Sequence, residues 1–339
     1  MATDRNKDKL LVVLGATGTQ GGAVLRFFAN QPNHLGFRLR GISRNVASEA
    51  SRSLQAIEVA MVETDLGNLE SLQRAFSEAT HIFANTDSNQ LIFEAVKRPE
   101  LLGEGQIPRT YAQEIEERYG SNIASAAASV PTLQRIVWSS LPSPKKWSNG
   151  RYLKVTMFDA KQTIADMLQS KPELCDKIST LMIGFYADNA LRVPEFCAPQ
   201  KQSDGVYELA WSMSGDVPVP IADVERDVGR WISALFQVSP GVVLIGSSEL
   251  MSWKEWLTLW GHRNHVETRY RETSPEEFSK KVPGLGDALL EELKFVEEYG
   301  FTGGQSDTIL PDQLGALGAP VDTTGISDHI ERCDWSKIL

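Results

Sequence analysis

Apolar residues in the first half of the chain gather in short runs, and amphipathic stretches separate these runs. Continuous apolar runs predict strands buried on both faces, and strict alternation predicts a strand as well. These patterns predict strands at 10–14, 37–44, 57–64, 80–86, 134–140 and 178–184. Apolar residues at helical spacing predict helices at 22–30, 69–79 and 119–130. Alternating strands and helices indicate an α/β fold with a doubly wound parallel sheet of the Rossmann type.

The pattern becomes less regular after residue 185. Short strands are predicted at 205–213 and 241–247, and helices at 222–236, 251–264 and 286–300. No linker rich in proline or serine separates the two parts. We therefore expect a Rossmann domain at 1–185 and a smaller mixed α+β lobe at 186–339, interleaved with it across one shared interface.

The composition excludes several classes of protein. The chain has 339 residues and a net charge of −10, which argues against a nucleic-acid surface because phosphate binding needs basic residues. No apolar stretch is long enough to span a membrane, and the polar N-terminus lacks the apolar segment of a secretory signal. Cys175, Cys197 and Cys333 are far apart and fit neither a disulfide framework nor a metal site. We expect a cytoplasmic protein without a metal.

Three glycines at equal spacing follow the first strand. Gly15 would let the chain turn sharply, Gly18 would let a pyrophosphate approach the backbone, and Gly21 would let the next helix pack closely. The helix N-terminus would face the phosphates. An ordinary strand-to-helix turn is the alternative. The other candidate cofactor-binding residues of the loop are Thr17, Thr19 and Gln20.

The end of the second strand indicates which dinucleotide would bind. It carries Ser43 and Arg44 and has no acid before Glu49. An acid there would take the ribose hydroxyls of NAD, whereas arginine can bind the 2′-phosphate of NADP. We therefore expect NADP(H) as the cofactor. The alternative is that Arg44 is only a solvated loop residue.

Polar residues also follow the third and fourth strands, at the edge of the sheet where ligands bind. Candidate cofactor-binding residues there are Asp65, Leu66, Asn85, Thr86 and Asp87. The alternative is that they only cap the following helices, because Asp and Thr are common at that position.

Five segments together resemble the NmrA-like proteins, which are atypical members of the short-chain dehydrogenase/reductase superfamily. They are "GATGTQGG", "SRN", "IVWSSLPSPKKWSNGRYLKVTMFDAKQTIADML", "GFYADN" and "VPIADVERDVGRWI". The resemblance covers about the first 240 residues. It implies an NAD(P)-binding domain and a small C-terminal lobe that holds the substrate. Members of the family are either dinucleotide-binding regulators without turnover or reductases, including fungal enzymes that reduce or cyclise imine-containing intermediates.

The resemblance places the family's lysine at Lys161, where it would hold the nicotinamide ribose. Met157 stands four residues earlier, where a short-chain dehydrogenase has its tyrosine and NmrA-like proteins often have histidine. Because a thioether cannot transfer protons, any acid must come from elsewhere. Tyr186 and Tyr152 are the candidates, and each could instead be a packing residue. Further candidates beside the cofactor are Ser139, Phe185 and Asn189.

Two features of the remaining sequence bear on function. Trp253, Trp256 and Trp260 lie at helical spacing, which predicts a buried helix face or, alternatively, the wall of a pocket for an aromatic ligand. The stretch 97–111 is predicted to be a mobile loop that could act as a lid.

We expect an NADP(H)-dependent oxidoreductase or redox-assisted cyclase of fungal secondary metabolism. Its substrate would be a small aromatic or imine-containing molecule. A homodimer is possible, and the sequence leaves the oligomeric state open. The competing hypothesis is a non-catalytic NAD(P)-sensing regulator that binds a partner protein.

Overall fold

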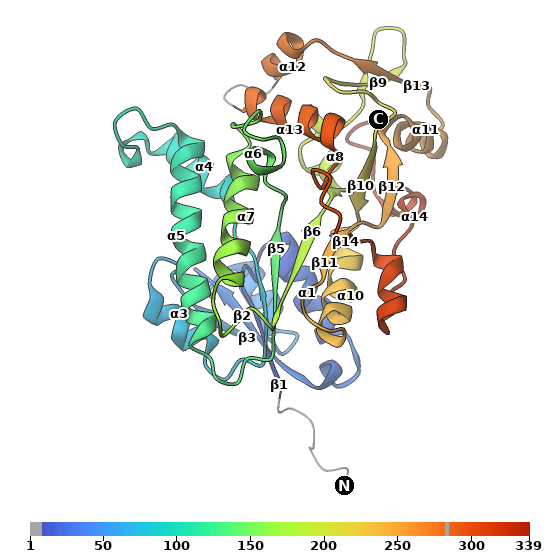
Figure 1. Ribbon diagram of the computed structural model, residues 1–339. Helices are drawn as coiled ribbons and strands as arrows, with labels where there is room; N and C mark the ends of the chain where they lie inside the picture. Colours follow the sequence, from blue (N-terminus) through green and yellow to red (C-terminus); the bar gives the residue numbers. More distant parts are fainter. Residues whose placement is uncertain (1–8, 282–284) are drawn as a thin grey trace.

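The computed structural model describes residues 9–281 and 285–339, and its centre is an eight-stranded sheet (Figure 1). Every neighbouring pair of its strands is parallel. The spatial order is β14-β11-β6-β5-β4-β1-β2-β3, so the strand order reverses between β1 and β4. The strands are β1 (Lys9–Val13), β2 (Phe37–Ser43), β3 (Ala60–Glu63), β4 (His81–Ala84), β5 (Arg135–Ser140), β6 (Ile178–Ile183), β11 (Val243–Gly246) and β14 (Thr308–Ile309).

Helices cover both faces of this sheet, which explains the continuous apolar runs. In β1, Leu11 and Val13 pack into one core cluster while Leu10 and Val12 pack into the other. Each face therefore buries alternate residues of the same strand. The first face carries α1 (Thr19–Ala29), α2 (Glu49–Gln55) and α10 (Val224–Gln237), and the second carries α3 (Leu69–Phe76), α5 (Pro108–Ala128) and α7 (Thr156–Gln169).

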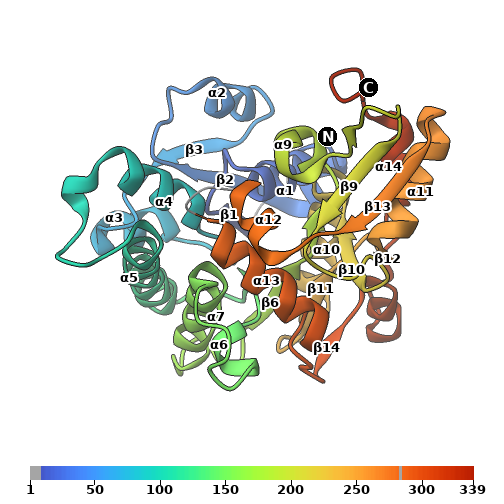
Figure 2. The same ribbon diagram turned by 90° about the horizontal axis from the view of Figure 1, so that it is seen from above.

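The smaller lobe lies above the carboxyl ends of the sheet (Figure 1). It contains two three-stranded sheets, β12-β10-β7 and β13-β9-β8. Their strands are β7 (Phe185–Tyr186), β8 (Gln200–Lys201), β9 (Tyr207–Trp211), β10 (Pro218–Ala222), β12 (Glu249–Ser252) and β13 (Thr268–Glu272). The α-helices of the described chain not named above are α4 (Ser88–Lys97), α6 (Pro144–Trp147), α8 (Asn189–Arg192), α9 (Pro194–Cys197), α11 (Trp253–Asn264), α12 (Pro275–Lys281), α13 (Gly286–Tyr299) and α14 (Ile326–Arg332). Of these, α4 packs against α5 of the large domain. Seen from above, α12 and α13 cross over the sheet (Figure 2).

The division of the chain at residue 185 does not separate the two parts in space. Strand β11 pairs with β6, and β14 pairs with β11, so both extend the large sheet. Helix α10 packs against α1, where a Cβ on Gly229 would lie 2.2 Å from the Cβ of Phe27. The assignment of 222–236 and 241–247 to the smaller lobe is therefore wrong, because their apolar faces complete the larger core.

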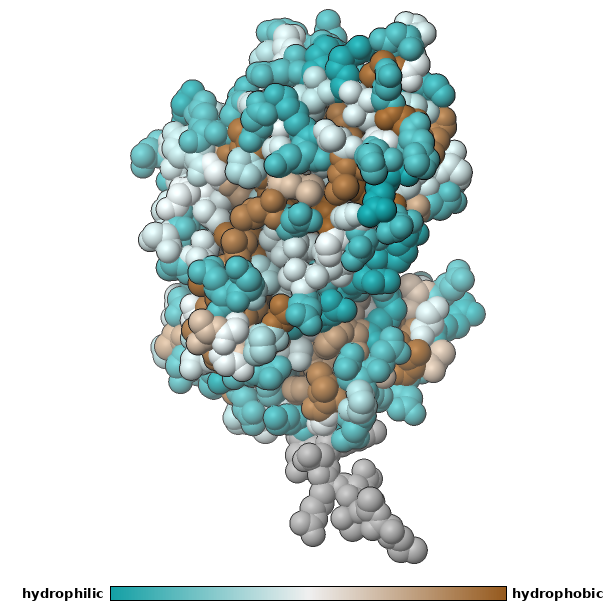
Figure 3. All heavy atoms as spheres, turned by 90° about the vertical axis from the view of Figure 1, so that its right-hand side faces the viewer, coloured by the Kyte–Doolittle hydropathy of each residue, from teal (hydrophilic) through white to brown (hydrophobic). Residues whose placement is uncertain are grey.

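Tryptophans fill the interior of the smaller lobe. Trp253, Trp256 and Trp260 are all buried, which confirms the buried helix face. The rings of Trp211 and Trp253 lie 4.5 Å apart and those of Trp260 and Trp335 lie 5.9 Å apart, so these rings pack on one another. On the side of the molecule shown in Figure 3, apolar residues occur in patches between more numerous polar ones. No described helix is both long and apolar enough to cross a membrane.

Several predicted boundaries differ from the structure. Strand β3 begins at Ala60 instead of residue 57, because the end of α2 continues into a turn in which the Ile57 amide donates to the Leu54 carbonyl. The predicted lid at 97–111 is shorter, because α4 ends at Lys97 and α5 begins at Pro108. Arg109 in the first turn of α5 forms a bidentate ion pair with Asp287 of α13, with N–O distances of 2.7 and 2.9 Å. This ion pair fixes the end of the loop to the smaller lobe.

The last helix, α14, docks on a buried carboxylate at the start of α10. Asp223 caps α10 and lies 2.9 Å from Nδ1 of His329, while the Arg332 guanidinium donates to the same oxygen at 2.5 Å. Burial would raise the pKa of Asp223, but the hydrogen bonds and charges of His329 and Arg332 outweigh burial and lower its pKa to about 2. The ionised carboxylate therefore stabilises the fold.

We expect Asp223→Asn to lower the free energy of unfolding by about 2–3 kcal/mol at pH 7. The folded-state pKa lies below the unfolded value, so this stabilisation is complete above about pH 4 and is lost as the pH falls towards 2. Urea denaturation between pH 3 and 7 measures the difference between the two proteins. The exposed Asp176→Asn is the control, and a difference that does not shrink on acidification would contradict this account.

Candidate functional site

The glycine turn lies at the carboxyl end of β1, beside the point where the strand order reverses. Gly15 has a φ of +68°, and a Cβ there would lie 2.2 Å from Oδ1 of Asn85. A Cβ on Gly21 would lie 2.3 Å from the Gly15 carbonyl oxygen, whereas one on Gly18 would lie 3.2 Å from it. Gly15 and Gly21 are thus required by the close packing of the turn, and Gly18 keeps the entrance to α1 free of a side chain.

The segment that contains β7 and α8 contacts the first turn of α1. The Gln20 side-chain amide donates to the Tyr186 hydroxyl at 2.7 Å, and Arg192 donates to the Thr19 hydroxyl at 2.7 Å. Arg192 also pairs with Asp188 at 2.5 Å. Burial raises the pKa of Tyr186, so its phenol is protonated at neutral pH. The structure therefore brings Tyr186 and an arginine to the predicted phosphate turn.

Lys161 lies in a buried polar network at the end of β4. Its ammonium donates to the backbone carbonyl of Thr86 and to the Thr86 hydroxyl at 2.6 Å, and it forms an ion pair with Oε1 of Glu116 at 2.9 Å. The indole of Trp138 lies below it, with the ring centroid 5.3 Å from Nζ. The ammonium is therefore held by two hydrogen bonds and one ion pair. The position of Lys161 is thus fixed at a strand end that also carries the candidates Asn85 and Thr86.

The position of the absent tyrosine is apolar. Met157 packs against a cluster of Leu91, Ile92, Ala112 and Ile115, formed by α4 and α5. Its side chain therefore closes a hydrophobic contact between helices and adds no polar group to the site.

The other candidates at the strand ends have local partners. The Asp87 carboxylate caps α4 by accepting from the Gln90 amide, and Asp65 accepts from the Gly67 amide at 2.8 Å. The Leu66 carbonyl accepts from Asn122 at 2.9 Å. Asp65 and Asp87 thus act as turn or cap residues in this structure, which is the alternative stated for them.

The remaining candidates lie on strands of the large sheet, just after β2, or in the smaller lobe. Arg44 is exposed and donates to Oε1 of Gln90 at 2.5 Å, so Ser43 and Arg44 end β2 beside the start of α4. Ser139 is buried in β5. Phe185 turns its ring towards Trp253, at 4.7 Å between centroids, and Asn189 begins α8.

Tyr152 is packed against α13. Its ring contacts those of Phe295 and Tyr299, each at 6.3 Å between centroids. Burial, together with Glu298, raises the pKa of Tyr152 to about 12. These contacts favour the packing role over proton transfer.

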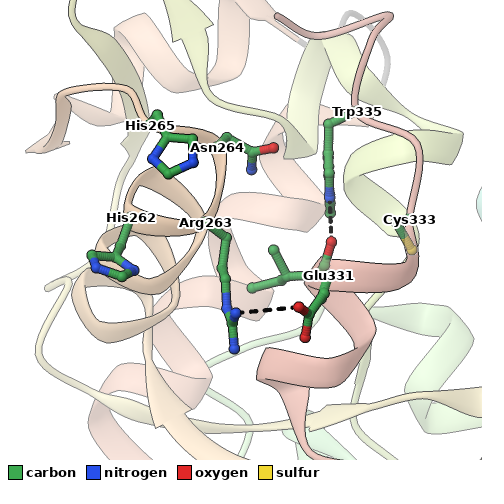
Figure 4. Close-up of a pocket in the computed structure, with 8 residues that line it drawn as sticks. His262, Arg263, Asn264, His265, Glu331, Cys333 and Trp335 are labelled. Atoms are coloured by element: carbon green, nitrogen blue, oxygen red, sulfur yellow. Dashed lines mark hydrogen bonds and ion pairs between the residues drawn. The ribbon is translucent and has the colours of Figure 1, made fainter.

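Two cavities are formed by described residues. One of about 330 Å³ borders the glycine turn at Ala16 and Thr17 and continues between α1 and α2. The other, of about 300 Å³, lies between the end of α11 and the segment after α14 (Figure 4). In the second cavity Arg263 points towards Glu331, at 3.4 Å. Lys161 and Tyr186 line neither of them.

Sequence reasoning missed Glu116 and Arg192. Glu116 belongs to a stretch of charged residues that is typical of a solvated helix, but it lies four residues after Ala112 and seven before Ile123, on the buried face of α5. That spacing is the signal that could have identified it. Arg192 has no comparable signal, because its contact with Thr19 joins segments 173 residues apart.

The strand order and the glycine turn at its reversal define a Rossmann-type α/β protein, as the sequence predicts. The model of the NmrA-like family matches residues 7–324, so the chain belongs to the NmrA-like family, and the resemblance stated from the motifs is confirmed.

Two relatives illustrate this membership. The NmrA-like family domain-containing oxidoreductase notA of Aspergillus sp. (strain MF297-2) is 28% identical over 248 residues, which cover 70% of this chain and 66% of that protein. The oxidoreductase cpsB of Aspergillus campestris is 24% identical over 341 residues, which cover 95% of this chain and 93% of that protein.

Solved structures share the fold. The negative transcriptional regulator NmrA in complex with NADP is 19% identical, with a TM-score of 0.70 over 98% of this chain and 97% of that one. The NADPH-dependent quinone oxidoreductase QOR2 from Escherichia coli, complexed with NADPH, is 18% identical, with a TM-score of 0.61 over 94% of this chain and 98% of that one.

Proposed function

We propose that this protein binds NADP(H) at the glycine turn and is an oxidoreductase that acts on a small organic molecule. The observation that carries the proposal is the convergence, at the reversal of strand order, of the side-chain-free turn with Lys161 and Tyr186. The relatives that are named oxidoreductases support the class of activity.

The residues at this edge fit the dinucleotide. Oε1 of Gln20 and Oδ1 of Asn85 are buried acceptors without a partner in the described structure, so each could receive a hydrogen bond from a ligand. The turn and the N-terminus of α1 would hold the pyrophosphate, with Arg192 beside it. Arg44, which is exposed just after β2, would bind the 2′-phosphate.

When bound, NADPH supplies a hydride for the reduction of an electrophilic carbon. Lys161, held at the end of β4, would donate hydrogen bonds to the nicotinamide ribose. Tyr186 carries a proton at neutral pH within contact of Gln20, so it is the better placed of the two tyrosines to donate one. Phe185 packs against Trp253 in the smaller lobe, whereas the neighbouring Tyr186 contacts Gln20 at the turn. We propose an aromatic or imine-containing substrate for this site. Fungal secondary metabolism is the setting that the Aspergillus relatives suggest.

A non-catalytic, dinucleotide-sensing regulator is the second candidate. It is favoured by two observations: the Lys161 ammonium is already engaged by the Thr86 carbonyl, the Thr86 hydroxyl and Glu116, and Met157 supplies no acid. A regulator would bind NADPH and show no turnover with any substrate. A reductase would bind NADPH and also turn over a substrate.

We expect Arg44→Ala to raise the Kd for NADPH by about 10- to 100-fold and to leave the Kd for NADH nearly unchanged, because only NADPH carries the 2′-phosphate. Tryptophan fluorescence titration with both nucleotides measures these constants. Arg74→Ala, an exposed arginine on α3, is the control. Equal losses for the two nucleotides would refute the role of Arg44, and wild-type protein that binds neither would refute the proposed function.

A further inference from the structure

A buried carboxylate that no sequence motif indicates lies beneath the Lys161 network. Glu116 of α5 is fully buried, with 0% of its side chain exposed. Its Oε1 forms an ion pair with the Lys161 ammonium at 2.9 Å and accepts from the Thr86 hydroxyl at 2.5 Å, and its Oε2 accepts from the Ser88 hydroxyl. One carboxylate thus connects α5 with the end of β4, the start of α4 and α7.

These contacts determine where the Lys161 ammonium can be. Nζ of Lys161 lies over the Trp138 ring, and the ammonium sits between the Thr86 carbonyl, the Thr86 hydroxyl and Glu116. The Thr86 hydroxyl donates to Glu116 and accepts from Lys161, so the same carboxylate also fixes the orientation of this hydroxyl. Without Glu116 the ammonium would be buried with neutral oxygens alone, which is costly.

We propose that Glu116 is a positioning residue of the cofactor site, which holds the Lys161 ammonium at the end of β4 for contact with the nicotinamide-side ribose. The inference rests on the proposed function, because it presupposes that NADPH binds at this edge. When a ribose hydroxyl takes one of the N–H bonds of Lys161, the ion pair with Glu116 keeps the ammonium in place. Glu116 itself touches protein groups and acts through Lys161.

Stability alone gives a weak reason for such a pair. A buried ion pair contributes little net stability compared with apolar residues of similar volume, because desolvation of both charges offsets their attraction. The neighbouring face of α5 already packs through Ala112, Ile115 and Ile123. A buried charge at this point is therefore better explained by the lysine that it orients.

The test uses two ligands that differ in the nicotinamide half. NADPH carries the nicotinamide ribose, whereas adenosine 2′,5′-bisphosphate retains only the adenosine end with its 2′-phosphate. We expect Glu116→Gln to raise the Kd for NADPH by about tenfold or more and to leave the Kd for adenosine 2′,5′-bisphosphate unchanged. Glu114→Gln, which removes an exposed carboxylate from the same helix, is expected to change neither constant.

Two further variants separate positioning from folding. Glu116→Asp keeps the charge but withdraws it by one methylene, so we expect the same selective loss, in smaller measure, in a protein of near-normal melting temperature. In a Lys161→Met background, Glu116→Gln should weaken NADPH binding no further, because Glu116 affects NADPH binding only through Lys161.

Several results would overturn the inference. They are equal losses for both ligands, an unchanged Kd for NADPH, or a further loss in the Lys161→Met background. Wild-type protein that binds neither ligand would instead refute the proposed function, so the two failures are distinguishable.

Discussion

Lys161→Met is expected to abolish NADPH-dependent turnover and also to lower the free energy of unfolding by about 3–5 kcal/mol. The first effect follows because no other described ammonium lies at the end of β4 within the network of Thr86 and Glu116. The second follows because Glu116, which is fully buried, would lose its counter-ion. Because this pair is buried, substitution of Lys161 alone lowers the stability of the fold as well as turnover. Consumption of NADPH followed at 340 nm and urea denaturation measure the two effects.

The double variant Lys161→Met with Glu116→Gln separates these effects. It removes both charges, so we expect most of the lost stability to return while turnover stays absent. Full turnover in the double variant would remove Lys161 from the mechanism. Failure to recover stability would show that the two side chains are not energetically coupled.

Gly15→Ala is expected to destabilise the protein by about 2–5 kcal/mol and to abolish detectable NADPH binding. The added methyl group meets two obstacles, since the φ of +68° is unfavourable for alanine and Oδ1 of Asn85 lies 2.2 Å from the new Cβ. Relief of this contact would displace Asn85 and the turn together. Thermal denaturation and fluorescence titration with NADPH provide the measurements.

Gly105→Ala is the matched control for this substitution. Gly105 also has a positive φ, of +72°, but its Cβ would have no neighbour within 4 Å. It should therefore show only the conformational cost of about 1–2 kcal/mol and normal NADPH binding. Equal behaviour of the two variants would mean that the packing of the turn against Asn85 is unimportant.

The contact between Arg192 and Thr19 bears on how the two halves of the molecule work together. Arg192 lies on α8, which follows β7, and reaches a hydroxyl on the first turn of α1 at 2.7 Å. A dinucleotide in the turn would compete for this guanidinium. The smaller lobe is thus joined to the proposed phosphate site through Arg192 as well as through Tyr186, and to the start of α5 through the ion pair of Arg109 and Asp287.

Much of the fold could be predicted from the sequence because the relevant signals are periodic or local. Strands β1, β4, β5 and β6 contain buried apolar runs, which arise because helices bury both faces, whereas β2 alternates. The glycine turn is a contiguous strand–turn–helix segment, so its three glycines identify it without knowledge of distant partners. The placement of β11 in the large sheet could not be predicted, because a short apolar strand carries no information about which sheet it joins.

The sequence by itself determined the Rossmann architecture and the glycine turn, and the family resemblance indicated Lys161 as a candidate site residue. Only the tertiary structure decided that Glu116 is the counter-ion of Lys161, that Tyr186 lies on Gln20 while Tyr152 packs on α13, and that Arg192 reaches the turn. The physical reason is that spacing along the chain fixes which face of an element is apolar. The partner of a buried charge is chosen by packing between elements that are far apart in the sequence.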